Sequence, residues 1–142
     1  MSSEQKYQAA LKAHDKAIAQ IKELDARLHE LSPFELAKLE YLYTKVERHA
    51  WTLAGIFKSQ SKFYEGMAEV AQGTAYKNIR AEQGKTGTDA QYESRIAKGN
   101  MLMEAGEHEG DFISWKGFAI SYEGARNSIK DMIKAIEAEG GK

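Results

Sequence analysis

The chain lacks cysteine, holds a single proline and contains no long apolar run. Without cysteine, disulfides, thiolate metal sites and cysteine nucleophiles are excluded, and the composition fits a reducing cytoplasm. A membrane span needs roughly 18 consecutive apolar residues, and the opening MSSEQKYQAALKAHDK lacks the apolar segment of a signal peptide. We therefore expect a soluble, cytoplasmic protein without a membrane partner.

The 142 residues are rich in alanine, glutamate and lysine and have few β-branched runs, which favours an all-α fold with one core. Residues 4 to 31 predict an amphipathic helix of coiled-coil character, because apolar residues recur there mostly at steps of three or four. These residues are Tyr7, Leu11, Ile18, Ile21, Leu24, Leu28 and Leu31. His14 and Asp25 interrupt the stripe and predict a partly filled seam.

A strong helix start follows at Ser32, where the serine is a candidate N-cap, Pro33 suits the first helical position and Glu35 completes a capping box. We expect this helix to run from Pro33 to about Gln72. Its stripe consists of Leu36, Leu39, Leu42 or Tyr43, Val46, Ala50, Leu53, Phe57, Met67 and Val70. Such a long helix needs a partner of similar length, from the same chain or from another subunit.

Glycines and capping signals divide the rest of the chain. We expect a bend between residues 73 and 80, a flexible connection at AEQGKTGTD, and a new helix opened by a capping box of Thr88 and Gln91. Gly106 to Gly110 predict a break or a kink before the last helix, which we expect from about Asp111 to Glu139. The last stripe consists of Phe112, Trp115, Phe118 or Ala119, Tyr122, Ala125, Ile129, Met132 and Ile136.

These elements predict long antiparallel helices packed as a hairpin or bundle. Residues 1–31 form the N-terminal amphipathic helix, which we expect to contact other subunits or a partner, and residues 32–142 form the main domain. Glycines beside the apolar stripe of the segment WKGFAISYEGARNSIK would let a second helix approach closely, which suits subunit packing.

The sequence offers no constellation typical of catalysis or metal binding. The four histidines lie on different elements without ligand spacing, and the pair Glu104 and His108 is better explained as surface charge in a turn. The string GKT invites a phosphate-loop interpretation, but Ile79 stands where that motif needs its first glycine. We expect no enzyme, no catalytic residue, no metal and no cofactor.

Charge is segregated along a chain whose net charge is −1. Residues 74–100 hold five basic and three acidic residues, whereas residues 101–111 hold four acidic residues and no base. Basic and aromatic residues also alternate, as single-stranded nucleic acid would require for phosphate neutralisation and base stacking. Three such groups occur. The first is Lys58, Lys62, Phe63 and Tyr64, the second is Tyr76, Lys77 and Arg80, and the third is Tyr92, Arg95 and Lys98. A solvated basic face and aromatics of an ordinary core are the alternatives.

The C-terminal helix resembles a known family. Trp115, the pair Gly124-Ala125 and the pair Ile129-Lys130 stand at the offsets found in the UvsY-type recombination mediators of T-even-like phages. Further similar features are Tyr92-Glu93 after a glycine-rich loop, Lys38-Leu39 with Tyr41, and the ending EAEGGK. The resemblance covers about residues 32–142. It departs from the family in a longer N-terminal helix and in a less basic element, Lys77-x-x-Arg80.

The resemblance implies a non-enzymatic helical protein that assembles into a homo-oligomeric ring of about hexamer or heptamer size and binds single-stranded DNA. It also implies contacts with a single-strand-binding protein and a RecA-like recombinase. The protein would help load the recombinase on covered strands during recombination, repair and replication, without a cofactor, in the cytoplasm of an infected bacterial host.

We assign phosphate contacts first to Lys77, Arg80, Lys58 and Lys62, and second to Lys85, Arg95 and Lys98. We assign assembly to Trp115, Tyr122, Ala125 and Ile129. The alternative function is a helical structural, adaptor or virion-associated oligomer that binds no DNA.

Overall fold

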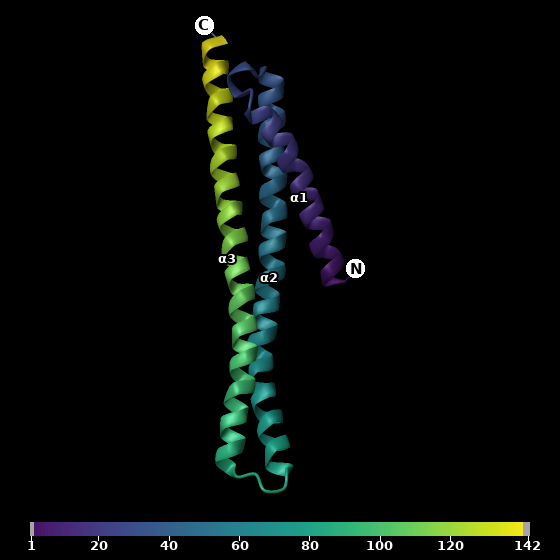
Figure 1. Ribbon diagram of the computed structural model, residues 1–142. Helices are drawn as coiled ribbons and strands as arrows, with labels where there is room; N and C mark the ends of the chain where they lie inside the picture. The colour runs from purple at the N-terminus through teal and green to yellow at the C-terminus, as the bar shows by residue number, and fades with distance from the viewer. Residues whose placement is uncertain (1, 141–142) are drawn as a thin grey trace. The chain divides into compact units, whose positions relative to one another are not determined.

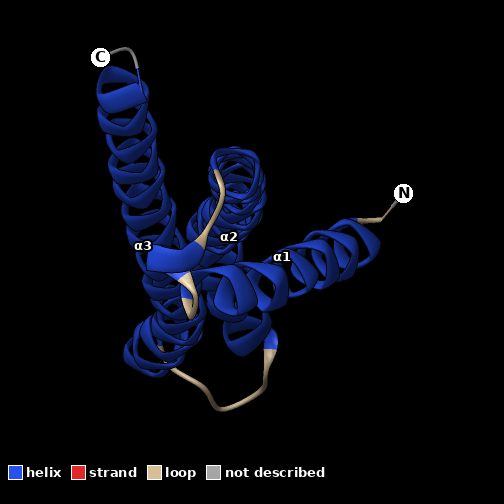
Figure 2. Ribbon diagram, turned by 90° about the horizontal axis from the view of Figure 1, so that it is seen from above, coloured by secondary structure: helices blue, strands red, loops and turns tan. Residues whose placement is uncertain are grey.

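The computed structural model describes residues 2–140 and is helical throughout, apart from short connections (Figure 1). The elements are helix α1 (Ser3–Asp25), the short 3-10 helix η1 (Leu28–Glu30), helix α2 (Pro33–Ala81) and helix α3 (Gly87–Gly140). No strand occurs among the described residues, and Figure 2 shows loops only between helices and before helix α1. The expected all-α class is confirmed.

The chain divides into two compact units, and α2 and α3 each contribute to both. Unit 1 comprises the described residues of 1–55 and 113–142, and unit 2 comprises residues 56–112. The N-terminal helix therefore packs in the same unit as the start of α2 and the end of α3.

Unit 1 is a three-helix bundle with a core of large aliphatic residues. Its buried cluster consists of Ala17, Ile21, Leu24, Leu31, Leu36, Leu39, Leu42, Val46 and Ile129. The predicted stripe of α2 is confirmed here, because Leu39, Val46 and Leu53 are completely buried. In α3 the alternative between Phe118 and Ala119 is decided for Ala119, which is fully buried while Phe118 is 48 % exposed.

The start of α2 forms as expected. The Ser32 backbone N–H donates to Glu35 Oε1 at 3.2 Å, and the Glu35 backbone N–H donates to Ser32 Oγ at 3.2 Å. This reciprocal pair satisfies donors that the first helical turn leaves without partners. The hydrogen bond from the Ser32 backbone lowers the pKa of Glu35, because it stabilises the charged carboxylate.

The N-terminal helix is shorter than expected, since α1 ends at Asp25 and a 3-10 turn follows. The histidine in its seam is accommodated by hydrogen bonds. His14 is buried, with Nε2 at 2.9 Å from the Tyr122 hydroxyl and Nδ1 at 3.0 Å from Asp15. A polar ring thus occupies a seam position without an unpaired nitrogen.

The predicted break at Gly106 to Gly110 was wrong, because α3 continues through both glycines to Gly140. Helix α2 likewise continues through Gly73 to Ala81, beyond its expected end near Gln72. A glycine costs a helix about 1 kcal/mol relative to alanine, which is too little to break a helix that packs along its length.

The connection between α2 and α3 is also shorter than expected. Gly84 adopts a φ of 83°, a left-handed conformation that glycine tolerates, and α3 begins at Gly87. The predicted cap at Thr88 and Gln91 was wrong by two residues. Instead Asp89 accepts hydrogen bonds from the Thr86 backbone and hydroxyl, and the Asp89 N–H donates to Thr86 Oγ1.

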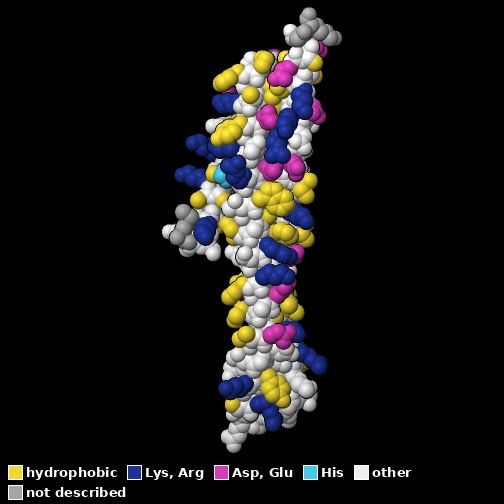
Figure 3. Space-filling model, turned by 180° about the vertical axis from the view of Figure 1, so that it is seen from behind, with side chains coloured by type: hydrophobic (Ala, Val, Ile, Leu, Met, Phe, Trp, Pro, Cys, Tyr) yellow, Lys and Arg dark blue, Asp and Glu magenta, His cyan; other side chains and the backbone are white. Residues whose placement is uncertain are grey.

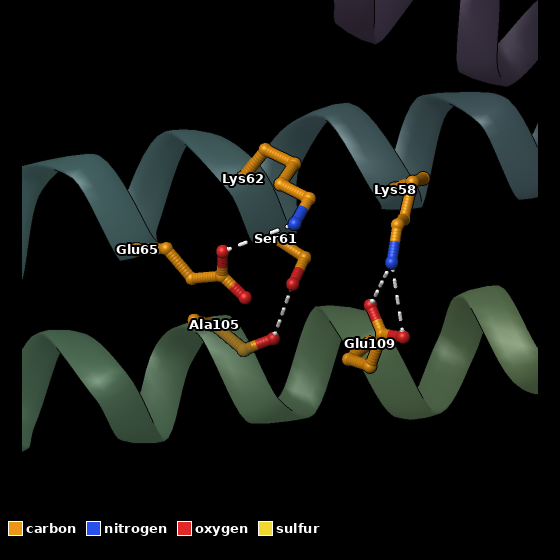
Figure 4. A network of polar contacts seen from close by, with 6 residues as sticks. All are labelled: Lys58, Ser61, Lys62, Glu65, Ala105 and Glu109. Atoms are coloured by element: carbon orange, nitrogen blue, oxygen red, sulfur yellow. Dashed lines mark hydrogen bonds and ion pairs between the residues drawn. The ribbon is translucent and has the colours of Figure 1, made fainter.

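Unit 2 is a helical hairpin held together by small residues. The residues buried in it are Ser61, Ala68, Ala90, Ser94 and Ala105. Ser61 Oγ donates to the Ala105 carbonyl oxygen at 3.0 Å across the two helices (Figure 4). Several large apolar side chains are exposed instead, and Val70, which we expected in the buried stripe, is 56 % exposed. The hairpin thus has a narrow seam between its helices and exposed apolar side chains on its outer faces.

Candidate nucleic-acid interface

All seven predicted phosphate contacts lie in unit 2. Four of them lie on α2 (Lys58, Lys62, Lys77 and Arg80), one lies in the connection (Lys85) and two lie on α3 (Arg95 and Lys98). They are the only basic residues between positions 56 and 112. The structure therefore places the whole predicted set on one hairpin.

Three of these lysines form ion pairs within the hairpin. Lys58 Nζ lies 3.1 and 3.0 Å from the two carboxylate oxygens of Glu109, and Lys62 Nζ lies 3.4 Å from Glu65 (Figure 4).

The third, Lys98 Nζ, lies 3.0 Å from Glu69. Two of the three pairs, to Glu109 and Glu69, connect α2 with α3, and spacing along the sequence could not reveal these partners. A cation already neutralised by a carboxylate attracts a phosphate less than an unpaired one, because the pair presents little net charge.

The other four cations form no ion pair among the described residues: Lys77, Arg80, Lys85 and Arg95. All four lie near the end of the hairpin. With a rise of about 1.5 Å per residue, Lys77 lies about 6 Å before the end of α2, and Arg95 lies about 12 Å after the start of α3. Figure 3 shows basic side chains around this end, at the bottom of the view.

Two exposed tyrosines accompany these cations. Tyr76 is 40 % exposed and precedes Lys77, and Tyr92 is 65 % exposed and lies one turn before Arg95. Tyr76 also borders a groove of about 390 Å³ in unit 2. The groove is lined by Glu69, Gln72, Gly73, Tyr76, Gln91 and Ser94. Exposed rings beside unpaired cations have the chemistry of a stacking platform for single-stranded nucleic acid.

The acidic residues near this end limit its positive potential. Between residues 74 and 100 the acids are Glu82, Asp89 and Glu93, which leaves a net charge of +2. Asp89 is committed to the cap of α3, and the hydrogen bond from the Thr86 backbone lowers its pKa, so the side chain carries a negative charge. One hairpin therefore presents only a weak attraction for phosphates.

The predicted pair of Glu104 and His108 lies on α3 and not in a turn. The His108 ring stacks on Tyr64, with 5.2 Å between ring centroids, and on Phe57, at 6.2 Å. Its buried Nδ1 has no hydrogen-bond partner among the described residues. Across residues 2–140 the structure brings together no group of three or more histidine or acidic side chains suited to a metal ion.

The residues assigned to assembly lie in unit 1, where the chain itself contacts most of them. Ile129 belongs to the core and is 4 % exposed. The Trp115 and His14 rings lie edge to face at 5.0 Å. The Tyr122 hydroxyl forms a hydrogen bond with the same histidine, and burial raises the pKa of Tyr122.

Ala125 is half-buried in the same helix. A role of these residues in assembly stays a prediction, and substitution of Ile129 would perturb the core of unit 1 in any event.

No helix in the described part of the chain is both long and apolar enough to cross a membrane. Comparison of the chain with protein-family models, with curated proteins and with solved structures found no match.

Proposed function

We propose that this protein is a non-enzymatic, homo-oligomeric mediator that binds single-stranded DNA and helps a RecA-like recombinase replace a single-strand-binding protein. The observation that carries the proposal is the gathering of unpaired cations and exposed tyrosines at the end of one hairpin. The cations without an ion pair among residues 2–140 are Lys77, Arg80, Lys85 and Arg95. The partners and the ring rest on the resemblance to the UvsY-type mediators.

The modest charge of one hairpin end suits such a role. Cations that neutralise phosphates release counterions, and exposed rings stack bases without sequence preference. Because one end has a net charge of only +2, a single copy binds weakly and several linked copies are needed for useful affinity. Contacts that are individually weak also let a strand be handed on, since each can be released by itself.

The test neutralises the two first-choice cations together in the variant Lys77→Gln/Arg80→Gln. Fluorescence anisotropy with a labelled single-stranded oligonucleotide gives the binding constant between about 50 and 200 mM salt. Each phosphate contact on a single strand contributes about −0.7 to the slope of log K against log salt. Losing two contacts per bound subunit should flatten that slope by about 1.4 per subunit.

The matched control is Lys62→Gln/Lys98→Gln, which removes two lysines that already pair with carboxylates in the same hairpin. We expect its slope to change less than that of the first variant. Equal slopes for the two variants and the unmodified protein would mean that the hairpin end does not contact phosphates. Absence of binding at 50 mM salt would favour the structural or adaptor function.

A further inference from the structure

The outer face of α2 in unit 2 carries bulky apolar residues alternating with glycines. Phe63, Gly66, Val70 and Gly73 follow one another at steps of three, four and three. Phe63 is 60 % exposed and Val70 is 56 % exposed. We call these four residues the α2 stripe.

The outer face of α3 in unit 2 repeats this pattern with identical spacing. Ile96, Gly99, Met103 and Gly106 again follow at steps of three, four and three, and we call them the α3 stripe. Ile96 is 43 % exposed and Met103 is 70 % exposed. Figure 3 shows hydrophobic side chains protruding at both edges of the hairpin in the lower part of the view.

The bulky residues of both stripes face away from the seam between the two helices. Successive residues of an α-helix are turned by about 100°, so residues two apart point in nearly opposite directions. On α2, Phe63 and Val70 each lie two residues after a buried seam residue, Ser61 and Ala68.

The same relation holds on α3, where Ile96 lies two residues after buried Ser94 and Met103 lies two residues before buried Ala105. A Cβ added at Gly66, Gly73, Gly99 or Gly106 would meet no atom within 4 Å. The hairpin's own packing therefore requires none of these glycines.

The two stripes fit each other in shape. A seven-residue repeat with one bulky and one small position lets the bulky residues of one helix enter the glycine notches of another. Because both stripes have the same spacing, an α2 stripe and an α3 stripe from two copies can stay in register over their full length. Within one chain they cannot meet, since they lie on opposite faces.

The charges of the two helices favour the mixed pairing. Residues 56–81 of α2 hold four basic and two acidic residues, a net charge of +2. Residues 87–112 of α3 hold two basic and six acidic residues, a net charge of −4. An α2 face beside an α3 face is attractive, whereas two α2 faces or two α3 faces repel each other.

We propose that the α2 stripe of one copy docks on the α3 stripe of the next, so that the hairpins of unit 2 associate side by side in a head-to-tail order. Such a heterologous contact leaves a free stripe at each end and grows until the ring closes. This docking rests on the proposed function, because it names the contact through which the proposed homo-oligomer assembles. It concerns only contacts between copies, and its test contains no DNA.

The test uses one variant blocked on each stripe, Phe63→Asp and Met103→Asp. Sedimentation velocity should show the unmodified protein as a multiple of the 15.9 kDa chain and each variant alone as a smaller species, mainly single chains. An equal mixture should form dimers of twice the chain mass and nothing larger. The intact α2 stripe of the Met103→Asp chain docks there on the intact α3 stripe of the Phe63→Asp chain.

Circular dichroism should show that the variants remain helical, and two further variants separate folding from docking. Gly99→Leu places a side chain in open space within one chain but in the notch between copies, so it should keep the fold and lose assembly. Phe34→Asp changes an aromatic residue that is 81 % exposed but lies in unit 1, and it should assemble normally.

Three results would overturn the proposal: an unmodified protein that is a single chain, variants that assemble like the unmodified protein, or blocked variants that fail to dimerise when mixed. A variant that forms dimers by itself would also overturn the proposal, and it would indicate pairing of like faces. Since no oligonucleotide is present, each of these results leaves the phosphate-contact proposal to be judged by its own titration.

Discussion

The small-residue seam of unit 2 makes the hairpin sensitive to added volume, and Ala68→Leu tests this. Ala68 is 1 % exposed in the seam of the hairpin, and leucine adds three carbon atoms there. Packed helix axes lie about 8 to 10 Å apart, depending on the side chains between them. The small residues of this seam favour a separation of the α2 and α3 axes near the lower end of that range. Overpacking of a well-filled seam costs about 1 to 3 kcal/mol.

Amide hydrogen exchange of the unit 2 helices measures this cost, because these amides open locally. A cost of about 1 to 3 kcal/mol corresponds to exchange roughly 5 to 160 times faster. The matched control, Thr74→Leu, adds leucine at an exposed position of the same helix and should leave exchange unchanged. Unchanged exchange in Ala68→Leu would refute the assignment of this residue to a tightly packed seam.

Two further predictions concern unit 1. Leu39→Ala should lower the free energy of unfolding in urea by about 2 to 5 kcal/mol, since Leu39 is fully buried in the core; a loss below about 1 kcal/mol would contradict that. Burial, with the charges of Lys45, His14 and Arg48, lowers the pKa of His49 from 6.5. The unfolded chain then binds a proton first as the pH falls. Thermal stability should therefore decrease below about pH 6.5, and His49→Gln should reduce that decrease.

Local signals in the sequence predicted most of the helical architecture. The capping box of Ser32 and Glu35 defined the start of α2, because this motif needs only contacts within one turn. Apolar spacing likewise predicted the buried face of α2 from Leu36 to Leu53, where three helices meet.

Glycine was the main source of error in the helix boundaries. Gly73, Gly106 and Gly110 lie inside continuous helices, since the energy of packing along a partner helix outweighs a local preference. The outward position of Val70 and Met103 likewise became apparent only when the buried residues Ala68 and Ala105 defined the inner faces of the two helices.

The sequence predicted which cations belong to the candidate site but not which of them form ion pairs. Spacing grouped the seven cations, yet it could not distinguish Lys58 and Lys98, whose partners lie on the opposite helix, from Lys77 and Arg80, which form no ion pair among the described residues. Partners distant in sequence are visible only in the folded hairpin. The proposed phosphate contacts are therefore those near the hairpin end, where the cations form no ion pair among the described residues.

The most direct test of the whole account is the mass of the protein in solution, measured by sedimentation velocity with and without a labelled single-stranded oligonucleotide. We predict a particle several times heavier than the 15.9 kDa chain, which carries the labelled strand at about 50 mM salt and releases it as salt rises. A single chain that sediments apart from the strand at 50 mM salt would contradict the account.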